Sequence, residues 1–538
     1  MARNSITLTI FFFLCMCTVL GQNRYMVFFT DKANTPYSIS QPGDFLTQRA
    51  ISRRLQQNVA ITEQDLPVNP GYVSGVKETG AQVFFTTRWM NGVLVQCDEE
   101  LVPMLEGLDF VNRVEFVAPD VRLLNGRRKT NRQNKSGRSA DVTDIQLTML
   151  GITTMHSEGY RGEGIIIAVF DSGFDGVDTG TPFQHLWDEN KIDLSVSQDF
   201  VYNSDNVFGY DDHGTMVFSV MAANESMTFT GGSYNANFQL YITEEVPTEY
   251  RVEEYNWLFA AERADSTGAD IIQASLGYND FDGTTMDYEK SAMNGTTTVV
   301  TRAAQWATDR GMVVVCSAGN EGNNSWQTIT APADATDVLA VANVNQTLQR
   351  SNSSSIGPSF DGRVKPDVAA LGTNTSVVRP SGAVGSASGT SLAAPLISSL
   401  VAGLWQRYPD LTNKELITAI RNSASQSSNP DHLIGYGIPS YTSVVNYLER
   451  AEQTRWFEVY PNPIYSDSLV IKPRDPVEIP SCQIQFISAD GKIILSKDIA
   501  FTWAESQYET SLKGFERGVY FLKITWKDKT FTHKLVKI

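Results

Sequence analysis

Five short apolar runs divide the middle of the chain. They are rich in Val and Ile, lack polar alternation, and are separated by segments with helical spacing. The runs cover residues 165–170, 238–242, 271–272, 312–316 and 338–342. Strands that are buried on both faces have this pattern, because helices cover both sides of a parallel sheet. We therefore predict an α/β domain over residues 141–450, with a mostly parallel, doubly wound sheet.

The segment before this domain has a different periodicity. It predicts strands at 25–29, 82–86, 93–96 and 111–117, with one helix over 44–55 and another from Asp98. The order strand-helix-strand-strand-helix-strand is that of a split βαβ unit. Residues 24–120 are therefore predicted to form a small α+β domain.

After Trp456 the pattern changes to alternating apolar and polar positions. Runs at 484–487 and 493–495 flank an Asp490-Gly491 pair, which favours a hairpin with a two-residue turn. A further run at 518–524 precedes the last strand. We predict an all-β sandwich over residues 456–538.

Two segments outside these domains have their own signatures. Residues 1–21 begin with a basic residue and continue into an apolar run, which is typical of a secretory signal peptide and short for a membrane span. Residues 121–140 form a basic linker: seven Lys or Arg and no Asp or Glu lie between 121 and 138. Such a stretch stays exposed, so we expect both a solvated linker and a processing region there.

The net charge of −17 argues against a nucleic-acid partner, because phosphate binding needs a basic face. The hydrophobic fraction of 42% and charged fraction of 19% are those of an ordinary globular protein. With the signal peptide, they indicate an exported protein.

Four motifs supply the parts of a serine acyl-transfer site. Ser391 in Gly389–Pro395 begins a predicted helix, where the dipole favours an oxyanion. His213 suits a base near neutrality, and Asp171 follows the first apolar run, from where it would orient that base. Asn320, in a Gly-rich turn, offers an amide to the oxyanion. Ligand sites lie beyond the carboxyl ends of parallel strands, where Asp171 and Asn320 are both expected.

The chain order Asp, His, Ser is that of subtilisin. With these motifs, residues 141–450 resemble a subtilisin-family serine endopeptidase (subtilase). The resemblance assigns catalysis to Asp171, His213, Ser391 and Asn320, and substrate binding to Ser275, Leu276, Gly277 and Gly319. Ser275-Leu276-Gly277 matches the strand that pairs with extended substrate, and Thr330 is expected near the floor of the primary specificity pocket. No cofactor is required for the chemistry. Structural calcium is possible in the family, but the metal ligands are unknown, because residues 224–233 differ from the stretch that binds it in some members.

The flanking domains carry resemblances of their own. Residues 24–120 resemble a subtilase propeptide, an intramolecular chaperone and inhibitor, with cleavage expected between Asp120 and Asp141. The motifs Tyr460–Pro463, Gly518–Tyr520 and Lys534–Ile538 resemble the type IX secretion sorting domain of Bacteroidota. The implied partners are polypeptide substrates, the chain's own propeptide and the secretion machinery, and we expect a monomer.

Four alternatives are open at this point. The C-terminal module could be a carbohydrate-binding sandwich, and the central domain a non-catalytic binding module, although no role residue is replaced. A serine esterase would need the Gly-x-Ser-x-Gly elbow, which the segment around Ser391 lacks. A Ser-Glu-Asp peptidase acting at acid pH would not need His213.

Overall fold

The computed structural model describes residues 22–119, 143–474, 479–502, 506–527 and 529–538. The predicted signal peptide and basic linker lie outside the described residues. The chain forms two compact units, one extending to residue 417 with 430–435, and the other containing 418–429 and 436–538. Within the described ranges, no helix is long and apolar enough to cross a bilayer.

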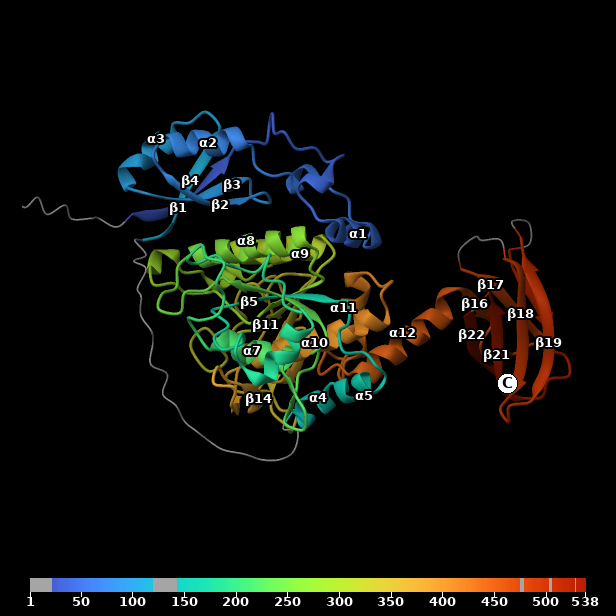
Figure 1. The fold of residues 1–538 in the computed structure, drawn as a ribbon. Helices are drawn as coiled ribbons and strands as arrows, with labels where there is room; N and C mark the ends of the chain where they lie inside the picture. Colours follow the sequence, from blue (N-terminus) through green and yellow to red (C-terminus); the bar gives the residue numbers. More distant parts are fainter. Residues whose placement is uncertain (1–21, 120–142, 475–478, 503–505, 528) are drawn as a thin grey trace, which may run out of the picture. The chain divides into compact units, whose positions relative to one another are not determined.

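The first unit is built on a seven-stranded sheet in which every neighbouring pair is parallel (Figure 1). Its spatial order is β13-β12-β11-β10-β5-β9-β6. The strands are β5 (Ile166–Asp171), β6 (Gln198–Asp199), β9 (Asn237–Ile242), β10 (Ile271–Ala274), β11 (Val313–Ser317), β12 (Leu339–Val344) and β13 (Val368–Leu371). The predicted α/β fold with a parallel sheet is confirmed.

Helices cover both faces of this sheet (Figure 1). α8 (Val252–Thr267) and α9 (Val299–Asp309) pack on one face, and α7 (His213–Ala222) and α10 (Thr390–Arg407) pack on the other. Strand residues such as Val169 and Val314 are fully buried because both faces are covered. α7 and α10 begin with a catalytic candidate in their first turns, so this layer positions the site.

The N-terminal module of the first unit (residues 22–119) has an antiparallel sheet of order β2-β3-β1-β4. Its strands are β1 (Asn23–Phe29), β2 (Gln82–Thr87), β3 (Gly92–Cys97) and β4 (Val111–Ala118), and its helices are α1 (Gln48–Gln56), α2 (Pro70–Glu78) and α3 (Val102–Glu106). The α+β prediction is confirmed. The sequence pattern missed α2, which covers the sheet's own face; α1, the helix it did predict, contacts α8 instead.

The two faces of this sheet are buried by different partners. Tyr25, Val27 and Phe29 of β1 pack in the module's own core. The alternate residues Met26 and Phe28 belong to the core that also contains α8 and α9. Strand periodicity thus divides β1 between two cores.

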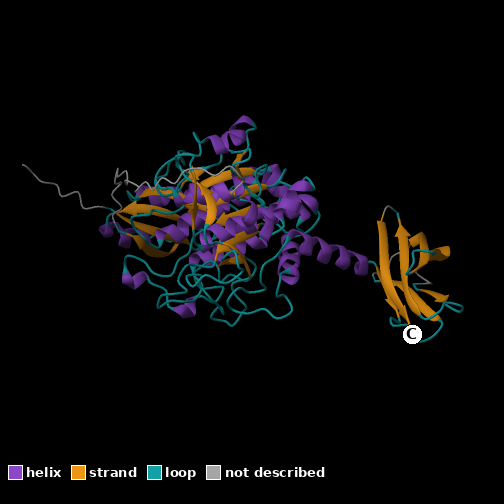
Figure 2. Cartoon of the chain, turned by 90° about the horizontal axis from the view of Figure 1, so that it is seen from below, coloured by secondary structure: helices purple, strands orange, loops and turns teal. Residues whose placement is uncertain are grey.

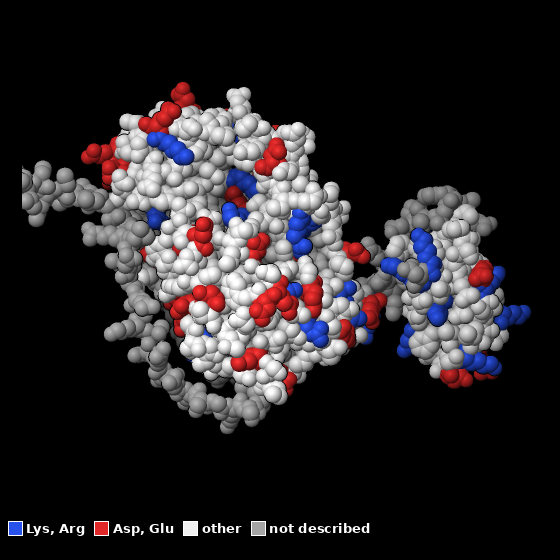
Figure 3. All heavy atoms as spheres, viewed as in Figure 1, with Lys and Arg blue, Asp and Glu red and all other residues white. Residues whose placement is uncertain are grey.

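Charged side chains of the N-terminal module also meet the outer surface of α8. Asp265 of α8 is fully buried and bonded by three guanidinium groups, from Arg53 (2.5 Å), Arg54 (2.7 Å) and Arg88. Nearby, Asp65 pairs with Arg310 of the central domain at 2.8 Å. Because all these groups are at least nine-tenths buried, each charge depends on its partners across the contact. Figure 3 shows Asp and Glu spread over much of the visible surface of this unit.

The second unit ends in an all-β region of antiparallel strands, which Figure 2 shows following helix α12 (Tyr441–Arg455). One sheet has order β16-β17-β20 and the other β19-β18-β21-β22. The strands are β16 (Phe457–Tyr460), β17 (Ser468–Pro473), β18 (Ile479–Ser488), β19 (Ile493–Phe501), β20 (Tyr508–Ser511), β21 (Gly518–Trp526) and β22 (Lys529–Lys537). Their buried side chains form one separate core. The predicted all-β region is confirmed.

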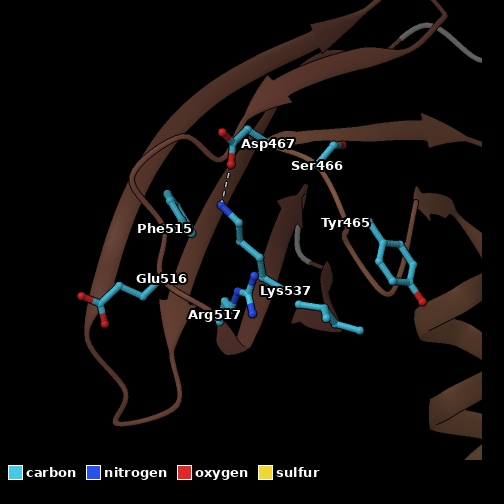
Figure 4. Close-up of a pocket in the computed structure, with 8 residues that line it drawn as sticks. Tyr465, Ser466, Asp467, Phe515, Glu516, Arg517 and Lys537 are labelled. Carbon is cyan, nitrogen blue, oxygen red and sulfur yellow. Dashed lines mark hydrogen bonds and ion pairs between the residues drawn. The ribbon is translucent and has the colours of Figure 1, made fainter.

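This region has a surface hollow near the end of the chain (Figure 4). Lys537 points into it from β22 and bonds Asp467 at 2.7 Å and the carbonyl of Leu512 at 2.9 Å. Phe515 and Arg517 line the same hollow. The lysine therefore ties the last strand to the loops beside it.

Candidate active site

Asp171 and His213 form a close pair at the carboxyl edge of the sheet. Asp171 is the last residue of β5, and His213 is the first residue of α7. Oδ1 of Asp171 accepts a hydrogen bond from Nδ1 of His213 at 2.7 Å. This bond fixes the tautomer with the proton on Nδ1 and leaves Nε2 as the basic nitrogen.

The residues around this pair explain the local motif. A Cβ at Gly214 would lie 2.9 Å from Cβ of Asp171, so only glycine lets α7 start this close to β5. Ser172 donates to Asp171 through its backbone N–H at 2.8 Å and its hydroxyl at 3.2 Å. Asp211 accepts from the backbone N–H of His213 at 2.9 Å and holds the helix start. The carboxylate and the imidazole are both positioned by neighbours in sequence.

The electrostatics of His213 favour its charged form. Burial disfavours the imidazolium, but the charge and hydrogen bond of Asp171, helped by Asp211 and Asp212, outweigh it and raise the pKa of His213 to about 9. Asp171 is fully buried, whereas about a third of the His213 side chain is exposed. An imidazolium formed during a reaction would therefore be stabilised in place.

Ser391 is the second residue of α10 and lies beside the end of β10. Its hydroxyl donates to the carbonyl of Ser275 at 3.3 Å, and the Ser275 hydroxyl donates to the carbonyl of Ser391 at 2.7 Å. β10 and β5 are parallel neighbours, with Ala274 opposite Phe170, so Ser275 and Asp171 follow adjacent strands. The structure thus brings Ser391 to the sheet edge that holds the Asp171–His213 pair, although its hydroxyl bonds Ser275 rather than His213.

Asn320 follows β11 in an exposed turn and faces the start of α10. Its Oδ1 accepts from the backbone N–H of Thr390 at 3.0 Å and from the Thr390 hydroxyl at 3.1 Å. Because the oxygen is held by these donors, the Nδ2 end of the amide is directed elsewhere. A Cβ at Gly389 would stand 3.8 Å from Nδ2, in ordinary van der Waals contact with the amide.

The side chain of Thr330 contacts both the Ser275-Leu276-Gly277 segment and the turn at Gly319. Gly319 has φ +103°, and a Cβ there would lie 2.8 Å from the hydroxyl oxygen of Thr330. Gly277 has no room for a Cβ for the same reason. Thr330 is buried between the two segments. Thr330 therefore lies beside both predicted substrate-binding segments. Its location near the floor of the primary specificity pocket stays a prediction.

The sequence patterns missed several polar residues around the site. Thr390, which orients Asn320, directly precedes Ser391, and Ser172, which bonds Asp171, directly follows it, so adjacency in sequence was the only available signal. The carboxylate oxygens of Glu244, Glu249 and Glu253 lie within 4.8 Å of one another, a spacing that could hold a metal ion. Carboxylate clusters are common without one, and calcium remains unassigned.

Comparisons with known proteins bear on all three regions. The family described as the subtilase family matches residues 162–437, just over half of the chain. Residues 24–137 match the Peptidase S8 propeptide domain of Bacteroidota, and residues 458–538 match a secretion system C-terminal sorting domain. The sorting domain marks an exported protein.

Individual relatives cover mainly the central domain. Subtilisin amylosacchariticus of Bacillus subtilis subsp. amylosacchariticus is 29% identical over 53% of this chain, which spans 66% of that relative, just under two thirds. The major intracellular serine protease of Bacillus subtilis (strain 168) is 27% identical over 58% of this chain and 93% of its own length. A solved structure, the epidermin leader peptide processing serine protease of Staphylococcus aureus, has a TM-score of 0.55 at 15% identity and covers 79% of this chain and 98% of its own. That structure supports the fold alone. Because the subtilase family matches just over half of the chain, through its central domain, the chain belongs to that family of serine peptidases.

Proposed function

We propose that the chain is an exported serine endopeptidase that hydrolyses peptide bonds through an acyl-enzyme. Ser391 is the nucleophile, His213 the general base, Asp171 the carboxylate that orients it, and Asn320 a donor to the oxyanion. The observation that carries this assignment is the 2.7 Å bond between His213 and Asp171 at the sheet edge where Ser391 also lies. The neighbouring strands β5 and β10 therefore bring the three side chains to one edge of the sheet: Asp171 ends β5 and holds His213, and Ser391 bonds Ser275 just after β10.

The first step requires a rotation of the Ser391 side chain. Its hydroxyl must turn from the Ser275 carbonyl toward Nε2 of His213. Catalytic hydrogen bonds are often loose before substrate binds and tighten in the complex. As Oγ attacks the carbonyl carbon, its proton passes to His213, and the imidazolium is stabilised by Asp171.

The oxyanion formed by this attack meets two donors. One is the Nδ2 amide of Asn320, whose oxygen end is held by Thr390. The other is the backbone N–H of Ser391, which lies in the first turn of α10 where backbone donors have no intrahelical partner. His213 then gives its proton to the leaving amine. In the second half of the reaction, water loses a proton to His213 and attacks the acyl-enzyme, and His213 returns that proton to the departing Ser391 oxygen.

Ser391→Ala tests the assignment. Removal of the nucleophilic serine costs on the order of 10⁶ in turnover, a figure measured for a subtilisin. We expect the wild-type chain to label with a fluorophosphonate at Ser391 and to cleave a peptide library, and the variant to do neither. Retained hydrolysis in a correctly folded Ser391→Ala protein would end the assignment. Asn320→Ala should keep the label but lose about 10²–10³ in turnover, as for the corresponding subtilisin donor.

The flanking regions give this activity its setting. We expect residues 24–120 to inhibit the domain until cleavage between Asp120 and Asp141, and residues 456–538 to direct export to the outside or the outer-membrane surface. Deletion of residues 456–538 should then trap the protein in the periplasm. A carbohydrate-binding module would instead leave export intact and lower polysaccharide binding.

A further inference from the structure

Three glutamates, which we call the glutamate cluster, converge between the end of β9 and the first turn of α8. Glu244 comes two residues after β9, Glu249 lies in the connection, and Glu253 is the second residue of α8. Each carboxylate places one oxygen within 4.8 Å of the other two. Two oxygens on opposite sides of a calcium ion are about 4.6–5.2 Å apart, because each Ca–O distance is about 2.3–2.6 Å. The spacing therefore fits three ligands of one Ca²⁺.

The carboxylate of Glu253 supplies an observation beyond this spacing. Glu253 is only 2% exposed, and its carboxylate points into the cluster. Its Oε2 is buried and has no hydrogen-bond partner. Burying a carboxylate oxygen without compensation is costly. Either a proton or a cation must therefore satisfy Glu253.

The next residue in the same helical turn shows a glutamate that the protein itself compensates. Glu254 is fully buried and accepts from the Tyr288 hydroxyl at 2.8 Å and from the backbone N–H of Val300 at 3.2 Å. Arg251 lies 3.7 Å from the same carboxylate. Both glutamates lie in the first turn of α8, where the helix dipole favours negative charge. The dipole therefore does not explain why Oε2 of Glu253 lacks a partner.

Basic side chains do not compensate the cluster either. Among the residues that the structure describes, no Lys or Arg forms an ion pair with its three carboxylates. Arg251, the nearest basic residue in sequence, lies 3.7 Å from the centre of the Tyr288 ring and pairs with Glu254. The cluster therefore keeps its negative charge unless something binds there.

Further acidic residues add to this charge. Burial, followed by the charges of Glu244, Asp280 and Asp282, raises the pKa of Glu249 to about 9. One proton shared between two carboxylates would neutralise a single charge, whereas a divalent cation neutralises two. A cation is therefore the more complete compensation.

Neighbouring groups hold two of the three ligands in place. Glu244 accepts from the Thr243 hydroxyl at 2.7 Å and from the hydroxyl of Tyr278. The backbone N–H of Glu249 donates to Oδ2 of Asp282 at 3.1 Å, and the backbone N–H of Asp282 donates to the Glu249 carbonyl at 2.9 Å. Such outer contacts orient the ligands of metal sites.

The same contacts connect the cluster to the candidate active site. Tyr278 directly follows Gly277, the end of the predicted substrate-binding segment. The backbone N–H of Thr243 donates to the carbonyl of Asp171 at 3.1 Å. An ion bound by the cluster would therefore hold the connection between β9 and α8 beside both.

We propose that Glu244, Glu249 and Glu253 bind one calcium ion, which fixes the connection between β9 and α8 next to the predicted substrate-binding segment. Carboxylate oxygens are hard ligands, which suit Ca²⁺ rather than softer metals. Water completes the coordination, since Glu244 and Glu249 are only partly buried. This inference concerns binding and does not require the peptidase assignment.

Terbium emission tests the site, because Tb³⁺ replaces Ca²⁺ among oxygen ligands and is excited by energy transfer from a nearby tyrosine. Tyr278, which bonds Glu244, is in position to transfer that energy. The full chain with Ser391→Ala is the parent protein. It is titrated with Tb³⁺ near neutral pH, and Ca²⁺ is then added to displace the terbium. We expect emission that grows on binding and falls on displacement.

Glu253→Gln in the parent removes the charge of the buried ligand and keeps its shape. Loss of a residue that only supports a ligand costs about 10–100-fold in metal affinity, so this variant should bind Ca²⁺ at least about tenfold more weakly and lose the displaceable emission. Glu289→Gln removes an exposed glutamate outside the cluster and is the matched control. The control should bind both ions as the parent does.

The outcomes decide between a cation and a proton. Metal sites elsewhere on the chain contribute equally to all these proteins, so the difference between parent and variant reports the cluster. Equal emission and equal Ca²⁺ affinity in the parent and Glu253→Gln would overturn the proposal and indicate a proton shared between carboxylates. Should Glu253→Gln not fold, Glu249→Gln replaces a more exposed ligand and should give the same loss. Every protein carries Ser391→Ala, so no outcome depends on peptidase activity, which the fluorophosphonate experiment tests separately.

Discussion

The N-terminal and C-terminal modules both contain antiparallel sheets, but they bury their surfaces differently. The C-terminal strands enclose one core between two sheets of their own. The N-terminal sheet shares its residues between its own core and that of the peptidase domain, and it places three arginines on the single carboxylate of Asp265. One module is complete in itself, and the other is completed by the domain that we expect it to inhibit.

This difference is what a temporary partner requires. A buried charge cluster is costly unless all its members are paired, so it is stable only in the assembled form. We expect Asp265 and the arginines to return to water, where each is well solvated, once the linker is cut and the module leaves. Apolar contacts supply attraction, whereas the charges specify one docked arrangement.

The largest expected difference lies in the folding of the isolated modules. A chain of residues 456–538 should fold alone with a cooperative thermal transition, because its core needs no other domain. A chain of residues 22–119 should be largely unfolded, because separation exposes the apolar face that includes Met26 and Phe28. Circular dichroism with thermal melting measures both. A stable, cooperatively folded N-terminal fragment would contradict the comparison.

The sequence predicts the strands and helices of the molecule better than it predicts the contacts between them. Continuous apolar runs identify β5, β9, β10, β11 and β12, because a strand buried on both faces has no polar alternation. β6 is missed since it contains only Gln198 and Asp199, and β13 since two of its four residues are Ala. α2 contains Gly71 and Gly75, which weaken the helical pattern.

The candidate site residues could be selected from the sequence without knowledge of tertiary contacts, because each lies in a short local motif. Asp171, His213, Asn320 and Ser391 each lie in a segment whose residue types match a role. The orientation of the Asn320 amide by Thr390, and the approach of Ser391 to the Asp171–His213 pair, depend on which strands are neighbours. Strand order is a tertiary property, so no local pattern reveals those contacts.

A single substitution at the buried charge cluster should loosen the N-terminal module. Asp265→Asn leaves Arg53, Arg54 and Arg88 without the charge they share, and breaking a buried pair from one side costs about 3–5 kcal/mol. We expect hydrogen exchange of β1–β4 to accelerate by about 10²–10⁴. The measurement uses the full chain with Ser391→Ala, so that processing does not interfere.

Asp309→Asn is the control for this experiment. Asp309 pairs with Lys414 at 3.6 Å, but both side chains are about half exposed, at 45% and 58%. Exposed pairs contribute about 0–1 kcal/mol, so exchange in β1–β4 should stay at the wild-type rate. Equal effects of the two substitutions would show that the buried cluster at Asp265 is no more important for docking than the exposed Asp309–Lys414 pair.

The smallest expected effect concerns charges that are close to His213 but only partly buried. Asp211 contributes to the raised pKa of His213, after the larger influences of burial and Asp171. Asp211→Asn keeps an oxygen for the backbone N–H of His213 but removes a negative charge, so the imidazolium becomes less favourable and its pKa falls. Since His213 acts as a base when neutral, the rise of kcat/KM with pH should move to lower pH. Asp205→Asn, which removes an exposed carboxylate from the loop after β6, is the control and should leave the profile in place. A profile equally unmoved by Asp211→Asn would show that Asp211 does not contribute to the basicity of His213, and that the charges of Asp171 and Asp212 account for it.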